Sequence, residues 1–366
     1  MRPLHILYVC PDARDARLVQ HTGTLALAML KEGLRVSLLL GGVSHSPLAK
    51  LKDVDVHYAP SAPKWQFWRH PLKTKFHDVV QADATIDIAH VVSLTHEAWA
   101  LPVLAKKLRV PCVVQAQNDT CLEATTWRKN CRKDYQKALE ACTPLVVNSQ
   151  HQLDKTKLLG LTRVTLIHEG IDTEEFKPVL SKRPLRRSLN LPELGTLVCC
   201  MASISPENKQ LEALQKCLPL SEKLQLVFVG PVRDTGYMAQ IQTLVSDAGA
   251  SGFVHWVDAA ANPADYLRAS DVFMLLGGIE TRQLTVLEAQ SCGLPVVLGP
   301  SASALALTNG GRSGIVLTQG SDRQLRRLLT NAASRQTKGM NGRPFVKKLY
   351  DFEQTVQAYL TLYRSL

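Results

Sequence analysis

Residues 271–297, DVFMLLGGIETRQLTVLEAQSCGLPVV, carry the pattern of a strand, a helix and a second strand. The apolar run 272–276 predicts a buried strand, and 285–291 predicts the start of a helix. A Cys-Gly-Leu-Pro sequence then ends the helix and leads into the apolar run 296–298. The pattern is that of a parallel β-α-β unit. In open α/β sheets ligands bind at the carboxyl ends of strands, and Glu280 lies at such an end.

Two carboxylates flank this strand-to-helix corner, Glu280 and Glu288. Carboxylate oxygens accept hydrogen bonds from sugar hydroxyls, and the N–H groups of a helix start can hold a phosphate. The corner therefore indicates a sugar-nucleotide site. Two ordinary interpretations compete with it. Thr285 and Glu288 have the spacing of a capping box, and Glu280 could be a solvated loop acid.

The residues around the two acids resemble a known family. Glu280, seven intervening residues and Glu288, followed by Ala289 and the run CGLPVV, resemble the E-x7-E signature of the retaining glycosyltransferases of family 4. These enzymes have the two-domain GT-B fold. The signature is specific because it fixes both acids and the apolar run after them.

Three other segments carry the same resemblance. Residues 164–172, VTLIHEGID, with Phe176 and Pro178 resemble the family's "viPNGvD…F.P" segment at the end of the first domain. Residues 224–230 resemble the family's "l.ivG" strand, and 265–272 resemble its "yl.asDv" segment. The resemblance therefore covers nearly the whole chain, and it is stronger in the second half.

The resemblance implies an α/β protein of the GT-B fold, with two Rossmann-like parallel-sheet domains facing each other across a cleft. A C-terminal helix is expected to cross back to the first domain. The acceptor-side domain is expected at 1–180, with 350–366 packing back on it, and the nucleotide-sugar-binding domain at 190–345. The Pro- and Arg-rich stretch 177–192 would then include the hinge.

The chain supports two α/β halves independently, because apolar strand patterns alternate with helical patterns. Strands are expected at 5–9, 36–40, 88–92, 112–116, 145–148 and 164–168 in the first half, with helical patterns such as 24–31 and 97–108. In the second half, strands are expected at 197–203, 224–230, 254–257, 272–276, 295–298 and 314–317. The tail 345–366 is predicted to be an amphipathic helix.

The donor site implied by the resemblance departs from the family pattern at one cation. Family members use an Arg and a Lys, after the first strand of the second domain, to neutralise the donor diphosphate. Lys209 corresponds to the lysine, displaced by about one position, although it could also be a solvated turn residue, and Ser203 stands where the arginine would be. A guanidinium binds a diphosphate strongly. Its loss is expected to weaken donor binding or to shift the contact to another cation, for which Arg282 is a candidate.

The remaining site residues follow from the same match. Glu280 is expected to contact sugar hydroxyls and Glu288 the ribose, with Glu280 and Lys209 as the catalytic pair and neither acid as a nucleophile. Gln117 stands where the family often has a histidine near the reacting sugar, and an amide cannot carry a proton. Ser203, Arg282, Leu284 and Thr285 complete the expected donor site, whereas Gln117, His168 and Gly170 are expected on the acceptor or cleft side. Three further departures are His168 at an asparagine position, Thr281 at a glycine position, and residues 11–17, which lack the family's Gly-Gly loop.

The function implied by the resemblance is transfer of a sugar from a nucleotide-sugar donor to a hydroxyl, with retention. No metal and no cofactor beyond the nucleotide sugar as co-substrate are implied. The acceptor would be a saccharide or a lipid-linked glycan in cell-surface polysaccharide or glycolipid assembly. One alternative is a catalytically degenerate GT-B protein that acts as a binding or scaffold subunit. Another is a GT-B epimerase or phosphorylase-type enzyme, although the two motifs are not the mark of those enzymes.

Charge and cysteine content narrow the partners and the location. The 43 basic and 32 acidic residues give a net charge of +11, which favours phosphorylated donors or an anionic membrane surface. No nucleic-acid-binding motif accompanies these charges. Residues 63–77 interleave aromatic and basic side chains, as in a membrane-interface segment or in a loop packed on its own domain. Nine scattered cysteines without metal spacing indicate reduced core thiols of a cytoplasmic protein. The apolar start 4–10 is expected to be a first strand, too short for a signal peptide. No segment approaches the run of about 20 apolar residues of a transmembrane helix.

Overall fold

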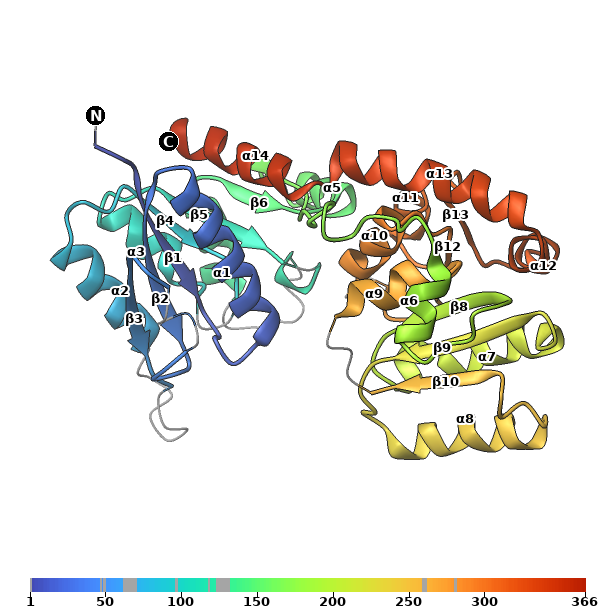
Figure 1. Cartoon of the computed structure of the whole chain (residues 1–366). Helices are drawn as coiled ribbons and strands as arrows, with labels where there is room; N and C mark the ends of the chain where they lie inside the picture. The colour runs from blue at the N-terminus through green and yellow to red at the C-terminus, as the bar shows by residue number, and fades with distance from the viewer. Residues whose placement is uncertain are drawn as a thin grey trace. The chain divides into compact units, whose positions relative to one another are not determined.

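The computed structural model describes residues 2–46, 48, 51–61, 71–95, 98–117, 119–122, 132–258, 262–279 and 282–366. The chain divides into two compact units (Figure 1). The first unit comprises Met1–His168 and Thr355–Leu366, and the second comprises Glu169–Gln354. Each unit is built on one parallel sheet, which confirms the predicted pair of Rossmann-like domains.

The first unit has a seven-stranded sheet in the order β3-β2-β1-β4-β5-β6-β7. Every pair of neighbouring strands is parallel, so helices return the chain from one strand to the next. The strands are β1 (His5–Cys10), β2 (Arg35–Gly41), β3 (Val54–Ala59), β4 (Ile88–Val91), β5 (Cys112–Ala116), β6 (Leu145–Val147) and β7 (Val164–Leu166), and the helices between them are α1 (Ala16–Lys31), α2 (Pro71–Ala82), α3 (Leu101–Lys107), α4 (Arg132–Ala141) and α5 (Gln150–Leu158).

The sequence did not predict β3. Its residues VDVHYA alternate in polarity, and all but Ala59 are partly or fully exposed. β1, by contrast, is buried along its whole length, as a central parallel strand covered on both faces should be. Asp55 and His57 therefore interrupt the continuous apolar run by which the other strands were predicted.

The second unit has a six-stranded parallel sheet in the order β10-β9-β8-β11-β12-β13. Alternate residues of β8 face two different core clusters, with Val198 on one side and Cys199 on the other, so both faces are covered. The elements are α6 (Lys182–Ser188), β8 (Thr196–Met201), α7 (Gln210–Cys217), β9 (Leu224–Val229), α8 (Thr235–Asp247), β10 (Val254–Val257), α9 (Pro263–Ala269), β11 (Val272–Leu275), α10 (Gln283–Ser291), β12 (Val296–Leu298), α11 (Ala304–Leu307), β13 (Gly314–Val316), α12 (Asp322–Thr330) and α13 (Ala332–Leu349).

The tail is two helices, not the single helix predicted for 345–366. α13 ends at Leu349, and α14 begins at Phe352 and ends at Arg364. Between them the backbone of Tyr350 accepts a hydrogen bond from the N–H of Ile171, and the N–H of Phe352 donates to the carbonyl of Ile171. These bonds take backbone groups that a continuous helix would need, so the helix is interrupted there.

Two expectations from composition can be compared with the structure. All eight cysteines among the described residues are buried and unpaired, and Cys131 lies outside those residues. Within the described ranges, no helix has both the length and the apolar content that a bilayer span would need. Of the aromatic and basic segment 63–77, residues 63–70 lie outside the described residues, whereas Phe76 is buried in α2.

From Thr355 onward, α14 is part of the first unit, as predicted for a helix that crosses back (Figure 1). Its Tyr363 hydroxyl lies 2.9 Å from the hydroxyl of Tyr8 on β1 and 2.6 Å from Nδ1 of His90 on β4. All three side chains are buried. Burial lowers the pKa of His90 to about 3, because the charged imidazolium would lose its hydration.

The buried His90 predicts a pH-dependent stability. The unfolded chain takes up a proton on this histidine near its ordinary pKa of 6.5, whereas the folded protein does so only near 3. Folding therefore loses stability as pH falls from about 6.5. We expect the Tm of the wild type to fall more steeply between pH 7.5 and pH 4.5 than the Tm of His90→Phe, measured by circular dichroism. His45→Gln, at an exposed position, should keep the wild-type slope. Equal slopes for all three proteins would contradict this role of His90.

Candidate functional site

The strand order places a switch point in the second unit between β8 and β11. From β8 the chain moves to β9 and β10 on one side, and from β11 to β12 and β13 on the other. Ligands of open α/β sheets bind outside the carboxyl ends of the strands at such a point. The two segments that meet there follow β8, from Ala202 to the start of α7, and follow β11, from Leu276 to the start of α10.

Two glycines allow these segments to touch. A Cβ on Gly277 would lie 2.1 Å from the carbonyl oxygen of Glu207. A Cβ on Gly278, whose φ is +62°, would lie 2.4 Å from Oδ1 of Asn208. Any side chain at either position would force the segments apart, so the Gly-Gly pair fixes their approach.

Arg282 bridges the same two segments. Its Nη2 donates to Oγ of Ser203 at 3.0 Å, and its Nε donates to Oδ1 of Asn208 at 3.1 Å. The guanidinium therefore lies against Ser203, the residue that stands where the family pattern has its arginine. The sequence placed Arg282 in the loop after β11 and offered it as a candidate cation, and the structure shows which residues it contacts.

Buried amides hold Ser203 in place. Nδ2 of Asn208 donates to the Ser203 carbonyl at 2.8 Å and to Oγ of Ser205 at 2.9 Å, and Nε2 of Gln210 donates to the same carbonyl at 2.7 Å. Asn208 and Gln210 are 4% and 1% exposed. Sequence reasoning assigned neither residue a role. The only sign of Asn208 and Gln210 in the sequence is that both are polar residues next to Lys209.

Lys209 lies between these two amides at the start of α7. It adopts the left-handed conformation with φ +56°, and its Nζ lies 3.6 Å from a carboxylate oxygen of Glu212. Both side chains of this pair are about half exposed, at 47% and 46%. The ammonium can therefore leave Glu212 for a ligand at little cost, because exposed ion pairs are weak.

Glu288 is a partly buried carboxylate in the second turn of α10. Burial, and secondarily the charge of Glu175, raise its pKa to about 7. Among the described residues it has no hydrogen-bond partner. The capping-box interpretation is wrong, because Arg282 is the N-cap and Thr285 is already the third helical residue. Glu280 and Thr281 lie outside the described residues.

Polar groups at the other strand ends include two buried atoms without a partner in the described part of the chain. One is the amide nitrogen Nε2 of Gln117, after β5, and the other is the hydroxyl of Ser301, after β12. Asn148 donates to the Gln117 carbonyl at 3.2 Å, and its own carbonyl lies 2.9 Å from Nδ1 of His168. The structure thus brings Gln117 and His168 together through Asn148. Gly170 belongs to the second unit.

Two family models match this chain. The model described as Glycosyltransferase Family 4 matches residues 18–175, and the model described as Glycosyl transferases group 1 matches residues 195–333. The chain belongs to glycosyltransferase family 4. The two matched regions fall on the first and the second half of this family 4 chain, and they include every strand of the two sheets except β1.

Curated relatives are similar to this chain over part of their own length. A D-inositol 3-phosphate glycosyltransferase of Salinispora arenicola is 29% identical over 55% of this chain and 49% of that protein. The lipopolysaccharide core biosynthesis mannosyltransferase LpsB of Rhizobium meliloti is 26% identical over 55% of this chain and 61% of that protein. The chain thus spans about half to three fifths of these relatives.

Solved structures are similar to this chain over nearly its full length. The Anabaena protein HepE, in complex with UDP and glucose, superposes with a TM-score of 0.77, 17% identity and 99% coverage of both chains. A glycosyltransferase of Rickettsia africae superposes with a TM-score of 0.82, 14% identity, and coverage of 100% of this chain and 99% of that chain. At these identities the likeness establishes the fold.

The raised pKa of Glu288 predicts a stabilising substitution. The folded protein holds a proton on Glu288 up to about pH 7, whereas the ordinary pKa in the unfolded chain is 4.5. Folding therefore loses stability as pH rises from about 4.5 to about 7. We expect Glu288→Gln to raise the Tm by a few degrees at pH 8 and to change it little at pH 4.5, in thermal unfolding. Glu222→Gln, at an exposed position, should be neutral at both. A lower Tm for Glu288→Gln at pH 8 would contradict the prediction.

Proposed function

We propose that this chain is a retaining glycosyltransferase that moves a sugar from a nucleotide-sugar donor to a hydroxyl of a saccharide or lipid-linked acceptor. The second unit would bind the donor at the switch point between β8 and β11, and the first unit would provide the acceptor side. The observation that supports this most directly is the contact of the Arg282 guanidinium with Ser203. This contact would supply a cation at the position where this chain lacks the arginine of the family pattern.

The proposed chemistry is electrostatic. As the bond from the anomeric carbon to the diphosphate breaks, negative charge develops on the leaving oxygens. Arg282 is held on two sides before any ligand binds, and Lys209 lies on the neighbouring turn, so two cations would meet the diphosphate. Fixed charges of this kind need no reorganisation during the reaction. Leu284 and Thr285 lie in the first turn of α10, whose N–H groups point outward from the helix and can bind a phosphate.

The two acids would orient the rest of the donor. Glu288 is partly buried and has no hydrogen-bond partner among the described residues, and ribose hydroxyls would supply the donors that its oxygens lack. Because these hydroxyls favour the ionised carboxylate, donor binding would lower the pKa of Glu288 from about 7. Glu280, as the first acid of the E-x7-E signature, would contact the sugar hydroxyls. Neither acid would act as a covalent nucleophile.

The class of acceptor rests on the relatives. The names of two of them concern inositol phosphate and the lipopolysaccharide core, which supports the proposal of a polysaccharide or glycolipid acceptor. A cytoplasmic location, with peripheral contact at the inner face of the membrane, stays a prediction. Trp65 and Trp68, on which the membrane-contact prediction depends, lie outside the described residues.

A degenerate binding or scaffold subunit remains the second candidate. The observation that favours it is Gln117, which replaces the family's histidine and cannot carry a proton. The contact between Arg282 and Ser203 favours an active enzyme instead, because a scaffold has no need for a relocated diphosphate cation. The two candidates differ in one measurable property: only the enzyme must bind a nucleoside diphosphate.

Substitution of Arg282 tests the diphosphate contact. A thermal-shift panel of UDP, GDP and ADP first identifies the base, since a ligand of the native state raises its apparent stability. Measured by calorimetry, Arg282→Gln should then lower the affinity for that nucleoside diphosphate by about tenfold or more, as expected for the loss of a hydrogen bond to a charged group. The variant should bind the corresponding nucleoside with nearly the affinity of the wild type. Arg326→Gln, an exposed arginine on α12, serves as the matched control. If the wild type binds none of the three diphosphates, the enzyme proposal fails.

Substitution of Glu288 tests turnover. We expect Glu288→Ala to abolish both transfer and donor hydrolysis, measured by release of the nucleoside diphosphate, while the circular dichroism spectrum stays that of the wild type. Glu222→Ala should retain full turnover. Unchanged turnover in the Glu288 variant would rule out its assignment to the donor.

A further inference from the structure

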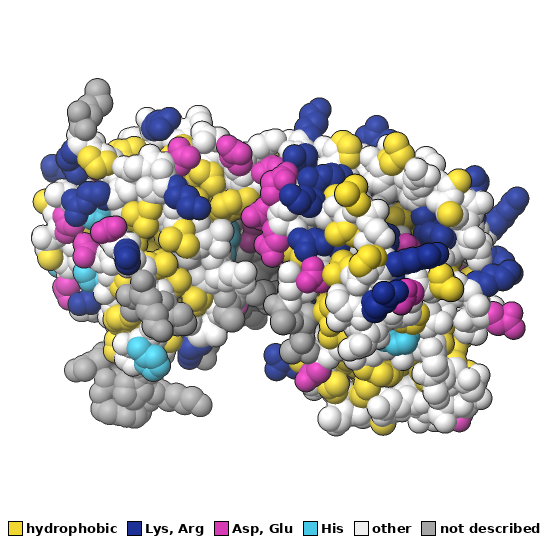
Figure 2. All heavy atoms as spheres, viewed as in Figure 1, with side chains coloured by type: hydrophobic (Ala, Val, Ile, Leu, Met, Phe, Trp, Pro, Cys, Tyr) yellow, Lys and Arg dark blue, Asp and Glu magenta, His cyan; other side chains and the backbone are white. Residues whose placement is uncertain are grey.

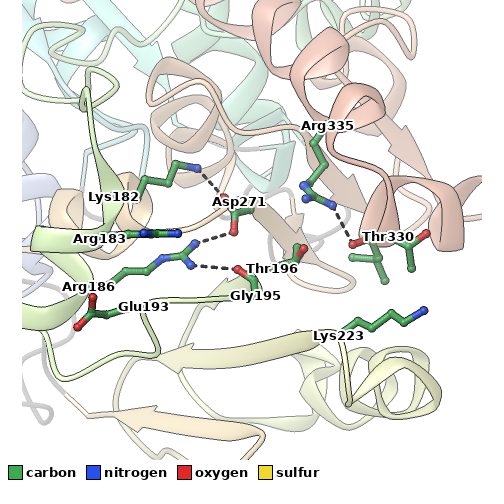
Figure 3. Close-up of a pocket in the computed structure, with 11 residues that line it drawn as sticks. Lys182, Arg183, Arg186, Glu193, Gly195, Thr196, Lys223, Asp271, Thr330 and Arg335 are labelled. Carbon is green, nitrogen blue, oxygen red and sulfur yellow. Dashed lines mark hydrogen bonds and ion pairs between the residues drawn. The ribbon is translucent and has the colours of Figure 1, made fainter.

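A basic cavity lies at the amino ends of the strands in the second unit. It has a volume of about 460 Å³ and is walled by α6, the starts of β8 and β11, the end of α12 and the start of α13 (Figure 3). The cationic side chains that line it are Lys182, Arg183, Arg186, Lys223 and Arg335. The proposed donor site lies at the opposite ends of the same strands. Since β8 has six residues, the two sites are separated by about 20 Å.

One of the two carboxylates in the cavity is already engaged by two of these cations. Asp271 lies 2.9 Å from Nζ of Lys182 through Oδ1 and 2.6 Å from Nη2 of Arg186 through Oδ2 (Figure 3). Arg186 is only 4% exposed and also donates to the carbonyls of Ala269 and Gly195, at 2.8 and 3.0 Å. Arg186 therefore fixes α6 to the sheet, and both carboxylate oxygens of Asp271 are already engaged by Lys182 and Arg186.

The second carboxylate is engaged outside the cavity. Glu193 accepts two hydrogen bonds from the guanidinium of Arg187, at 2.8 and 2.9 Å. Three cations of the cavity therefore have no carboxylate hydrogen-bonded to them. In the described part of the chain, the Arg183 guanidinium and the Lys223 ammonium make no hydrogen bond. Arg335 donates through Nη1 to the carbonyls of Leu328 and Leu329 at the end of α12.

These cations approach the cavity from different elements. Arg183 comes from α6 on one side, and Arg335 of α13 and Lys223, which precedes β9, come from the other (Figure 3). Burial lowers the pKa of Arg335, and the nearby positive charge of Arg186 acts in the same direction against the opposing effect of Asp271. An anion bound in the cavity would favour the charged form of Arg335 and so offset the effect of burial on its pKa.

We propose that this cavity binds the phosphate group of a multiply charged phosphate ester. Guanidinium and ammonium groups are the side chains that proteins use for this anion, and net positive charge in a concave site concentrates it. A volume of about 460 Å³ is in the range of small-molecule sites, so the cavity has room for the organic part of the ester. A ligand here would leave the donor site open.

Two sources could supply the same chemistry. One is a soluble phosphate ester, and the other is the headgroup of an anionic phospholipid. Figure 2 shows Lys and Arg side chains gathered over the part of the second unit that carries α6, α12 and α13. Such a surface would attract either source, so the experiment has to separate them.

The test uses the full chain with inorganic pyrophosphate as the probe. The native side chains of Arg183 and Lys223 make no hydrogen bond in the described part of the chain. The double variant Arg183→Gln/Lys223→Gln should therefore keep the fold. By calorimetry, we expect this variant to bind pyrophosphate at least about tenfold more weakly than the wild type. The control Arg323→Gln/Lys348→Gln removes two exposed charges elsewhere in the second unit and should match the wild type. Repeating the titrations in an Arg282→Gln background reduces the contribution of the donor site. Equal affinity in all three proteins would overturn the proposal.

Vesicle binding identifies the source. Phosphatidylcholine vesicles with and without phosphatidylglycerol are sedimented with the same proteins. Loss of binding to the anionic vesicles in the cavity variant, but not in the control, assigns the cavity to a lipid headgroup. Equal vesicle binding, together with the difference in pyrophosphate affinity, assigns it to a soluble ester. The nucleoside diphosphate of the donor site should bind both double variants equally, so this proposal and the proposed function can fail independently.

Discussion

The close approach of two loops at the switch point is the constraint on which the candidate donor site depends. Gly277 and Gly278 leave no room for a side chain between the end of β11 and the turn at Glu207 and Asn208. This contact brings Arg282, which follows in the same loop, within hydrogen-bonding distance of Ser203. Arg282 thus contacts Ser203, the position where the family pattern has its arginine, from 79 residues further along the chain.

The sequence predicted those parts of the structure that depend on local patterns. β1, β8 and β11 are continuous apolar runs, and the order of such runs and helices was enough to predict two parallel sheets. β3 could not be found in this way because Asp55 and His57 interrupt its apolar residues. The break before α14 could not be found either, because backbone hydrogen bonds to Ile171 cause it. The local sequence pattern of the tail gives no sign of these bonds.

The same limit applies to the site. The corner 271–297 identified Glu288 and the loop that holds Arg282, because the spacing of residues within one β-α-β unit is visible in sequence. The network of Asn208, Gln210 and Ser203 was not predicted, since it depends on how two separate loops pack. Glu288 shows a related cost: a carboxylate that is partly buried, with no hydrogen-bond partner among the described residues, is expected to lower the stability of the fold when it is ionised.

The hydroxyl contacts of Tyr363 with Tyr8 and His90 have a consequence for biosynthesis. Domains generally fold in the order in which the ribosome releases them, but the first unit is interrupted in sequence by the whole of the second. Its seven strands emerge early, while the helix that covers Tyr8 and His90 is translated only after residue 354. Until then a buried histidine and a tyrosine of the finished protein face water or a chaperone. The nascent first unit is therefore a partly folded species whose lifetime is set by the time needed to translate the second.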